Sequence, residues 1–270
     1  MDRVTSKDGT SIAYDRHGSG PAVILVGGAF VDRSENAPLA TELAARFSVY
    51  NYDRRGRGDS GDTQPYALER EIEDIQALIA EAGGSAHLYG ISSGGALALE
   101  AAAAGIAVDR LAVYEVPYNM ADDGQQRHQE YVQQLEGFLA EGRRGDAAEL
   151  FMRLAGASEE MVAGAKSSPM WPGLEAIAHT LAYDAACMGD NRPPTARLAK
   201  LTRPTLVATG GASPEDSHMG GLPTDFFDEA ADAIAASIPQ AERQTIEGGA
   251  HVVDPRALAP VLERFFRAGR

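Results

Sequence analysis

The stretch Ala-His-Leu-Tyr-Gly-Ile-Ser-Ser-Gly-Gly-Ala-Leu-Ala-Leu-Glu, residues 86–100, decides the fold of this chain. Its first four residues are typical of a buried strand, and the small residues that follow predict a helix ending at Gly105. Between the two elements, residues 90–94 match Gly-x-Ser-x-Gly with Ser92 at the centre. Glycines on both sides permit a sharp strand-to-helix turn, which leaves a serine exposed at the sheet edge.

The alternative interpretation of this turn is a glycine-rich connection in which Ser92 only caps the helix. Ser93 is a rival nucleophile, but Ile91 stands where its motif would need glycine. The position of the motif, directly after a predicted strand and before a predicted helix, favours Ser92 as a nucleophile.

The rest of the chain alternates between strand and helix patterns. Strands are predicted at residues 11–15, 22–26, 49–52, 111–114, 205–209 and 244–246, and helices at residues 39–47, 68–79, 224–237 and 255–267. Such alternation predicts an α/β fold, with a mostly parallel central sheet and helices on both faces.

Residues 118–196 break this rhythm, because they hold helical patterns around 127–141, 146–155 and 174–185 and no convincing strand. We therefore expect an all-helical cap, residues 118–196, inserted into a core made of residues 1–117 and 197–270.

Composition excludes several classes of protein. The 24 basic residues against 39 acidic ones give a net charge of −15, which argues against binding to nucleic acid or to anionic lipid. One cysteine, Cys187, permits neither an intramolecular disulfide nor a cysteine-based zinc site. The N-terminus lacks an apolar leader and no long apolar run follows, so we expect a cytoplasmic protein with a small-molecule partner. Oligomeric state is left open.

A serine hydroxyl needs a neighbouring base to act as a nucleophile near neutral pH. Of the six histidines, His251 follows the predicted strand 244–246 through two glycines and precedes Asp254-Pro255, a good start for the last helix. It therefore lies at the carboxyl edge of the sheet, as Ser92 does. The other histidines show no spacing typical of a metal site, and we expect no metal.

Together these features resemble the α/β-hydrolase fold. The resemblance covers nearly the whole chain: the Gly27-Gly28 turn, the loop at residues 53–60, the serine turn, the helical insertion and the terminal histidine. Family members often have His-Gly in place of Gly27-Gly28, a change that keeps the backbone amides. The resemblance and the glycine spacing both indicate that the loop at 53–60 is a structural turn.

The resemblance implies a role for each matching residue. Ser92 would be the nucleophile and His251 the general base. The backbone N–H groups of Ser93 and Ala29 would form the oxyanion hole, which stabilises charge that develops in the transition state.

The acid of the expected triad departs from the usual pattern. Most members have Gly-x-x-Asp after the strand before the last, but residues 210–213 read Gly-Gly-Ala-Ser, and Ser213 cannot supply a negative charge. We expect Glu115 to replace it, because Glu115 ends the strand next to the serine turn, where some haloalkane dehalogenases of this fold carry their acid. Glu215 and Asp216 remain alternatives, as does a site with no working acid.

The sequence thus predicts a serine hydrolase for a small ester, lactone or related acyl compound, with no cofactor. The same fold also supports perhydrolases, C–C hydrolases and lyases, and a degenerate site would leave a non-catalytic binding protein. Dehalogenases and epoxide hydrolases of this fold need aspartate where Ser92 stands, which excludes them. Apolar residues near the site in sequence are expected to line the pocket, namely Phe30, Met120, Trp171 and Val252.

Overall fold

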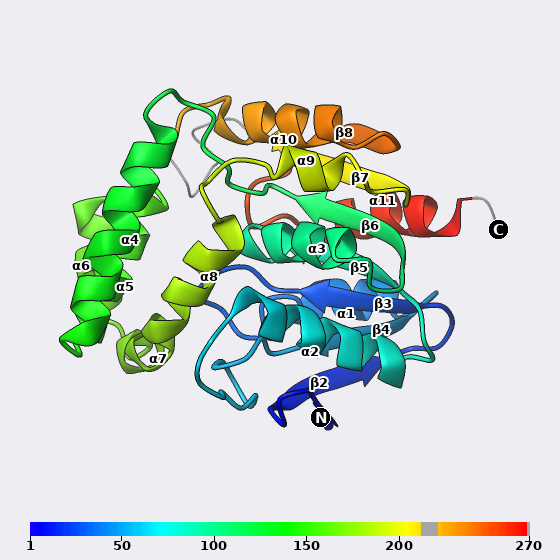
Figure 1. Cartoon of the computed structure of the whole chain (residues 1–270), viewed down its shortest axis with the longest axis horizontal. Coiled ribbons are helices and arrows are strands. Elements are labelled where there is room, and N and C mark those ends of the chain that lie inside the picture. Colours follow the sequence, from blue (N-terminus) through cyan, green and yellow to red (C-terminus); the bar gives the residue numbers. More distant parts are fainter. Residues whose placement is uncertain (212–220, 269–270) are drawn as a thin grey trace.

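The central element is an eight-stranded sheet with the order β1-β2-β4-β3-β5-β6-β7-β8 (Figure 1). We describe it from a computed structural model that covers residues 1–211 and 221–268. The pairs β1–β2 and β2–β4 are antiparallel, and every other pair is parallel. The strands are β1 (Asp2–Thr5), β2 (Ser11–His17), β3 (Ala22–Val26), β4 (Ser48–Tyr52), β5 (Ala86–Ile91), β6 (Val108–Tyr114), β7 (Thr205–Gly211) and β8 (Ala241–Glu247).

Helices cover both faces of this sheet, as the alternating pattern predicts. The helices of the core are α1 (Ala37–Leu43), α2 (Leu68–Glu81), α3 (Ser93–Ala103), α9 (Thr195–Leu198), α10 (Phe226–Ser237) and α11 (Pro255–Arg267). Apolar side chains of α2, α3, α9 and α10 form one buried cluster with the sheet, and those of α1 and α11 form a second cluster on the opposite face. The start of α11 follows the sequence prediction, since Asp254 caps it by accepting a hydrogen bond from the Arg256 amide.

Every regular element described between β6 and β7 is helical. These are α4 (Gly124–Ala140), α5 (Arg144–Leu154), α6 (Glu159–Lys166), α7 (Trp171–Ile177), a 3₁₀ turn (Ala178–Thr180), α8 (Leu181–Met188) and the short α9. We call α4 to α8 the inserted helices. They lie at the side toward which the parallel strands point (Figure 1). Their apolar cluster includes Phe30, from the loop after β3, so they pack directly on the carboxyl edge of the core.

Several elements differ from the sequence prediction, among them the short helix α9, which was not predicted. The pattern at residues 174–185 is divided between α7 and α8 by the 3₁₀ turn. The helix α6 was not predicted, because it is short and buries only Val162. The strand β1 was not predicted either, because it is a four-residue edge strand with no buried residue to produce an alternating pattern.

No helix within the described residues is both long and apolar enough to cross a bilayer.

Candidate active site

The serine turn after β5 has the strained backbone that its motif predicts. Ser92 adopts φ 54° and ψ −130°, which few residues other than glycine adopt. Its amide is held by the carbonyl of Tyr114 on β6 at 2.9 Å. The turn is also packed tightly: a Cβ at Gly90 would lie 2.4 Å from the Gly94 carbonyl oxygen, and one at Gly94 would lie 2.3 Å from the Gly27 oxygen. Both glycines of the motif are therefore required by close backbone contacts.

The two serines of the turn have different surroundings. Ser92 is partly exposed, whereas Ser93 is 3% exposed. The Ser93 hydroxyl donates to Asp184 Oδ1 at 2.8 Å and accepts a longer hydrogen bond from Arg54 at 3.3 Å. A hydroxyl held in a buried ion-pair network, with no imidazole beside it among the described contacts, is unsuited to attack a substrate. The structure therefore favours Ser92 over Ser93 as the reactive serine.

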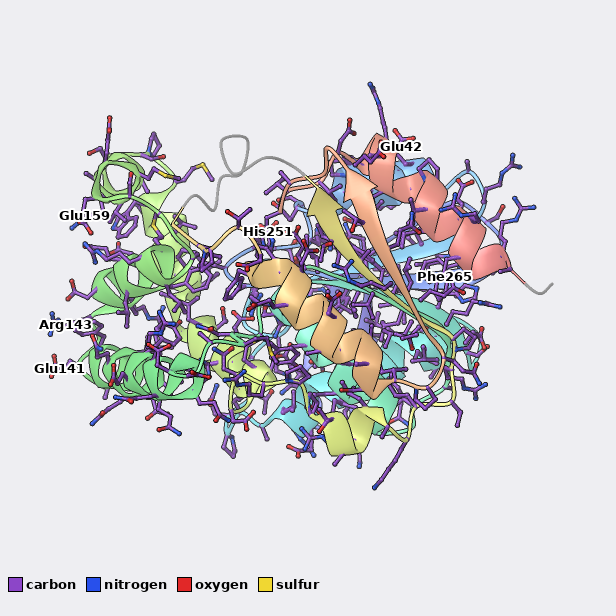
Figure 2. All side chains as sticks on the ribbon, turned by 90° about the horizontal axis from the view of Figure 1, so that it is seen from above. Glu42, Glu141, Arg143, Glu159, His251 and Phe265 are labelled. Atoms are coloured by element: carbon purple, nitrogen blue, oxygen red, sulfur yellow. The ribbon has the colours of Figure 1, made fainter. Side chains whose placement is uncertain are left out.

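Two of the predicted residues, from strand ends far apart in sequence, form a hydrogen-bonded pair. His251 Nδ1 lies 2.8 Å from Glu115 Oε2, and the side chains are 15% and 5% exposed, respectively. The other carboxylate oxygen of Glu115 accepts a hydrogen bond from the Gly210 amide at 2.8 Å. Glu115 thus meets a donor on each oxygen, and the second ring nitrogen of His251, Nε2, is left to act elsewhere. In Figure 2, His251 lies on the side of the core that faces the inserted helices.

The loop that carries His251 is held by a hydrogen bond, a ring stack and a close backbone approach. Tyr114 donates its hydroxyl to the carbonyl of Ala250 at 2.7 Å. The ring of Phe227 stacks on the imidazole with centroids 5.0 Å apart. A Cβ at Gly210 would lie 2.1 Å from the Gly249 carbonyl oxygen, so only glycine fits beneath this loop. The glycine that begins the family's usual acid pattern therefore has another use here, as a donor to Glu115.

The alternative acids Glu215 and Asp216, like Ser213, lie outside the described residues. The Gly210 and His251 contacts of Glu115 therefore carry the structural argument for the acid.

The two amides expected to form the oxyanion hole have no partner within the described part of the chain. Ala29 N and Ser93 N donate to no atom there. The turn before Ala29 lies directly against the serine, since a Cβ at Gly28 would be 3.2 Å from Ser92 Cβ and 3.8 Å from its Oγ. Unpaired amides beside a nucleophile can stabilise a developing oxyanion.

The four residues predicted to line the pocket have separate environments. Phe30 follows Ala29 and packs edge-on against Phe151 of α5, with ring centroids 5.6 Å apart. Met120 packs against the buried apolar cluster that the sheet forms with α2, α3, α9 and α10. Val252 is 61% exposed and borders a hollow of about 100 Å³ between α1 and α11. Of the four, Phe30 is the one that adjoins a predicted site residue and also contacts an inserted helix.

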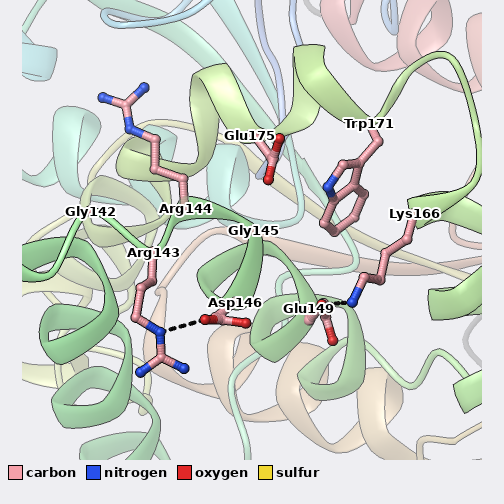
Figure 3. Close-up of a pocket in the computed structure, with 9 residues that line it drawn as sticks. All are labelled: Gly142, Arg143, Arg144, Gly145, Asp146, Glu149, Lys166, Trp171 and Glu175. Carbon is pink, nitrogen blue, oxygen red and sulfur yellow. Dashed lines mark hydrogen bonds and ion pairs between the residues drawn. The ribbon is translucent and has the colours of Figure 1, made fainter.

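Trp171 lies inside the inserted helices. Its indole lines a cavity of about 510 Å³ whose other walls are Gly142, Arg143, Arg144, Gly145, Asp146, Glu149, Lys166 and Glu175 (Figure 3). None of these is a predicted catalytic residue. The arginine and lysine charges are partly neutralised, because Arg143 pairs with Asp146 and Lys166 pairs with Glu149. The expectation that Trp171 lines the substrate pocket stays a prediction.

Sequence reasoning missed the burial of three arginines in the loop at residues 53–60. Arg54, Arg55 and Arg57 are each no more than 2% exposed. Their partners include Glu71 and Asp74 on the inner face of α2. Burial raises the pKa of Glu71, but the charge of Arg54 outweighs it, so the pKa lies below its usual value. The signal available in the sequence was the pair of acids within the apolar stripe of that helix.

No group of three or more His, Cys, Asp or Glu side chains in residues 1–211 and 221–268 is arranged to hold a metal ion.

Comparison with known proteins gives the family. The model of the alpha/beta hydrolase family matches residues 17–263, so the chain belongs to that family. It is 50% identical to an alpha/beta hydrolase from Sphaerobacter thermophilus DSM 20745, with a TM-score of 0.85 over 98% of this chain and 100% of that one. A thermophilic esterase from Thermogutta terrifontis shares the fold, with a TM-score of 0.70 and 22% identity over 98% of this chain and 97% of that one.

A further relative is the uncharacterized hydrolase YraK of Bacillus subtilis (strain 168). The identity is 33% over 96 residues, which are 34% of this chain and 35% of that protein. The match therefore spans about a third of the relative's length.

Proposed function

We propose that the chain is a serine hydrolase for small esters, lactones or related acyl compounds. In this mechanism Ser92 Oγ attacks the acyl carbon while Nε2 of His251 takes the hydroxyl proton. His251 then gives that proton to the leaving group, and an acyl-enzyme forms on Ser92. Water then attacks the acyl carbon while His251 takes its proton, the bond between the acyl carbon and Ser92 Oγ breaks, and His251 returns the proton to Ser92 as the acid product leaves. All of these steps use only side chains, backbone amides and water.

The observation that carries the proposal is the 2.8 Å contact between His251 Nδ1 and Glu115 Oε2. A carboxylate at Nδ1 holds the tautomer in which Nε2 is unprotonated and stabilises the imidazolium that forms during attack. It also weighs against a non-catalytic binding protein, an alternative suggested by Ser213 standing where most family members have the acid.

The amides of Ala29 and Ser93, which have no partner among the described residues, support the same proposal. Acyl transfer places a negative charge on the former carbonyl oxygen, and fixed N–H groups stabilise that charge most strongly where water is excluded. Removal of a single such donor typically lowers kcat by about 10²–10³-fold.

The nucleophile and the inserted helices support the proposed substrate class. An esterase shares this fold at 22% identity. The inserted helices pack on the loop that carries Ala29, through Phe30, so they limit the acyl compounds that can reach Ser92.

The test is turnover of a short p-nitrophenyl ester by the wild type, by Ser92→Ala and by Ser85→Ala. Ser85 is an exposed serine that hydrogen-bonds to Asp109. We expect Ser92→Ala to abolish turnover and Ser85→Ala to keep it. A wild type without activity, or a fully active Ser92→Ala, would refute the proposal.

A further inference from the structure

Two buried guanidinium groups donate hydrogen bonds to the backbone carbonyls of the Gly27-Gly28 turn, which lies beside Ser92. Arg57 Nη1 donates to the carbonyl oxygen of Gly28 at 2.6 Å. Arg54 Nη1 makes a longer contact of 3.4 Å with the carbonyl oxygen of Gly27. Both side chains are 1% exposed, so these hydrogen bonds form without competition from water.

One carboxylate from the inserted helices joins these contacts to the serine turn. Asp184, on α8, accepts two hydrogen bonds from Arg57 Nη2, each of 2.8 Å, and one from Arg54 Nη1 at 2.7 Å. It also accepts the Ser93 hydroxyl at 2.8 Å. Asp184 therefore connects the loop before Ala29 with the residue after the nucleophile.

Because the peptide bond is planar, the hydrogen bond to the Gly28 carbonyl also determines the direction of the Ala29 N–H. The Gly28 carbonyl and the Ala29 N–H belong to one trans peptide unit, so they point in opposite directions. A hydrogen bond that fixes the carbonyl also fixes the direction of the N–H, and it polarises the amide so that the N–H becomes a better donor.

From this geometry we infer that Arg57, together with Asp184, positions the oxyanion hole. Arg57 orients the Ala29 amide through the Gly28 carbonyl, and Asp184 holds the Ser93 side chain, whose own amide is the second donor. Neither side chain touches the substrate. The inference rests on the proposed function, and it assigns Arg57 and Asp184 the role of positioning residues.

Arg55 provides a matched comparison within the same loop. It is as deeply buried as Arg57, and it pairs with Asp74 and Asp8 and donates to the Arg70 carbonyl. All three of its guanidinium nitrogens are bonded, whereas Arg57 Nε has no partner within the described structure. Arg55 therefore holds α2 and the loop but contacts neither the Gly27-Gly28 turn nor Ser93.

The experiment compares Arg57→Lys with Arg55→Lys in the full chain, using an ester that the wild type hydrolyses. Each variant is measured for kcat, KM and thermal unfolding, with rates corrected for the folded fraction. Lysine keeps the charge but cannot bind Asp184 and the Gly28 carbonyl together with a guanidinium's geometry. We expect Arg57→Lys to lower kcat by about 10–100-fold with KM changed by less than about threefold. We expect Arg55→Lys to lower the unfolding temperature but to keep kcat within about threefold.

Ser93→Ala tests the role of Asp184 in holding the Ser93 side chain, and it replaces Arg57→Lys as the test if that variant does not fold. It removes the hydroxyl held by Asp184 but keeps the amide. We expect a fall in kcat of about three- to tenfold at unchanged KM. The inference would be overturned if folded Arg57→Lys and Arg55→Lys had equal kcat values. If Arg57→Lys fails to fold, an unchanged kcat in Ser93→Ala would overturn it. A wild type that hydrolyses no ester would instead refute the proposed function.

Discussion

Replacing Glu115 with glutamine tests the acid of the proposed triad through its hydrogen-bond geometry. In the wild type, Oε1 faces the Gly210 amide and Oε2 faces His251 Nδ1, each at 2.8 Å. Glutamine keeps one oxygen and replaces the other with an NH₂ group. The Gly210 N–H can only donate, so the glutamine oxygen must remain there and its NH₂ must face the imidazole.

The consequence is a reversal of the His251 tautomer. A donor at Nδ1 makes that nitrogen the acceptor and places the ring proton on Nε2, which can then no longer take the proton of Ser92. The charge that stabilises the imidazolium is also lost. We expect kcat to fall by about 10³–10⁴-fold, which corresponds to about 4–5.5 kcal/mol of transition-state stabilisation.

The assay is the initial rate of p-nitrophenyl ester hydrolysis at saturating substrate, with unfolding followed by circular dichroism. Glu247→Gln is the matched control, because Glu247 is an exposed carboxylate at the end of β8. Glu215→Gln and Asp216→Asn should also keep activity. A Glu115→Gln enzyme within tenfold of the wild-type kcat, or a larger loss in either of the alternative acids, would refute the assignment.

Three further predictions concern stability and reactivity. Gly94→Ala should lower the free energy of unfolding by more than about 2 kcal/mol in urea titrations, because its Cβ would lie 2.3 Å from the Gly27 carbonyl oxygen. A change below about 1 kcal/mol, typical of a surface substitution, would contradict this prediction. Burial lowers the pKa of His128 from its usual 6.5, so the unfolded chain binds the proton more readily and the stability should fall as the pH drops below about 6.5. His128→Gln should flatten this pH dependence of the unfolding temperature. An unchanged slope in the variant would argue against the prediction. Burial also raises the pKa of the Cys187 thiol, so a thiol reagent should modify the native chain at least about a hundredfold more slowly than the urea-unfolded chain, and comparable rates would be inconsistent with the buried site.

Much of the fold follows from periodicity in the sequence. The strand at Ala22–Val26 and the helix at Pro255–Arg267 have the predicted bounds, because an unbroken apolar run and a capped amphipathic pattern are both strong signals. The strand β1 lacks such a signal, since its pairing with β2, and not its own side chains, keeps it extended.

The candidate site residues that follow strands of the parallel sheet could be predicted from the sequence. Ser92, Glu115 and His251 all follow strands, and the carboxyl ends of parallel strands meet at one edge of the sheet. The network of Arg57 and Asp184 was not predictable in this way. Charged residues are usually exposed, and the partners are 127 residues apart, so no local pattern reveals that the two charges are buried together.

The most direct test of the account is covalent labelling of the intact chain with a fluorophosphonate, followed by peptide mass spectrometry. We predict one adduct per chain, formed on Ser92 with loss of fluoride, absent from Ser92→Ala and formed much more slowly in Glu115→Gln. Absence of an adduct on the folded wild type, or an adduct that persists in Ser92→Ala, would contradict the claim that Ser92 is an activated nucleophile.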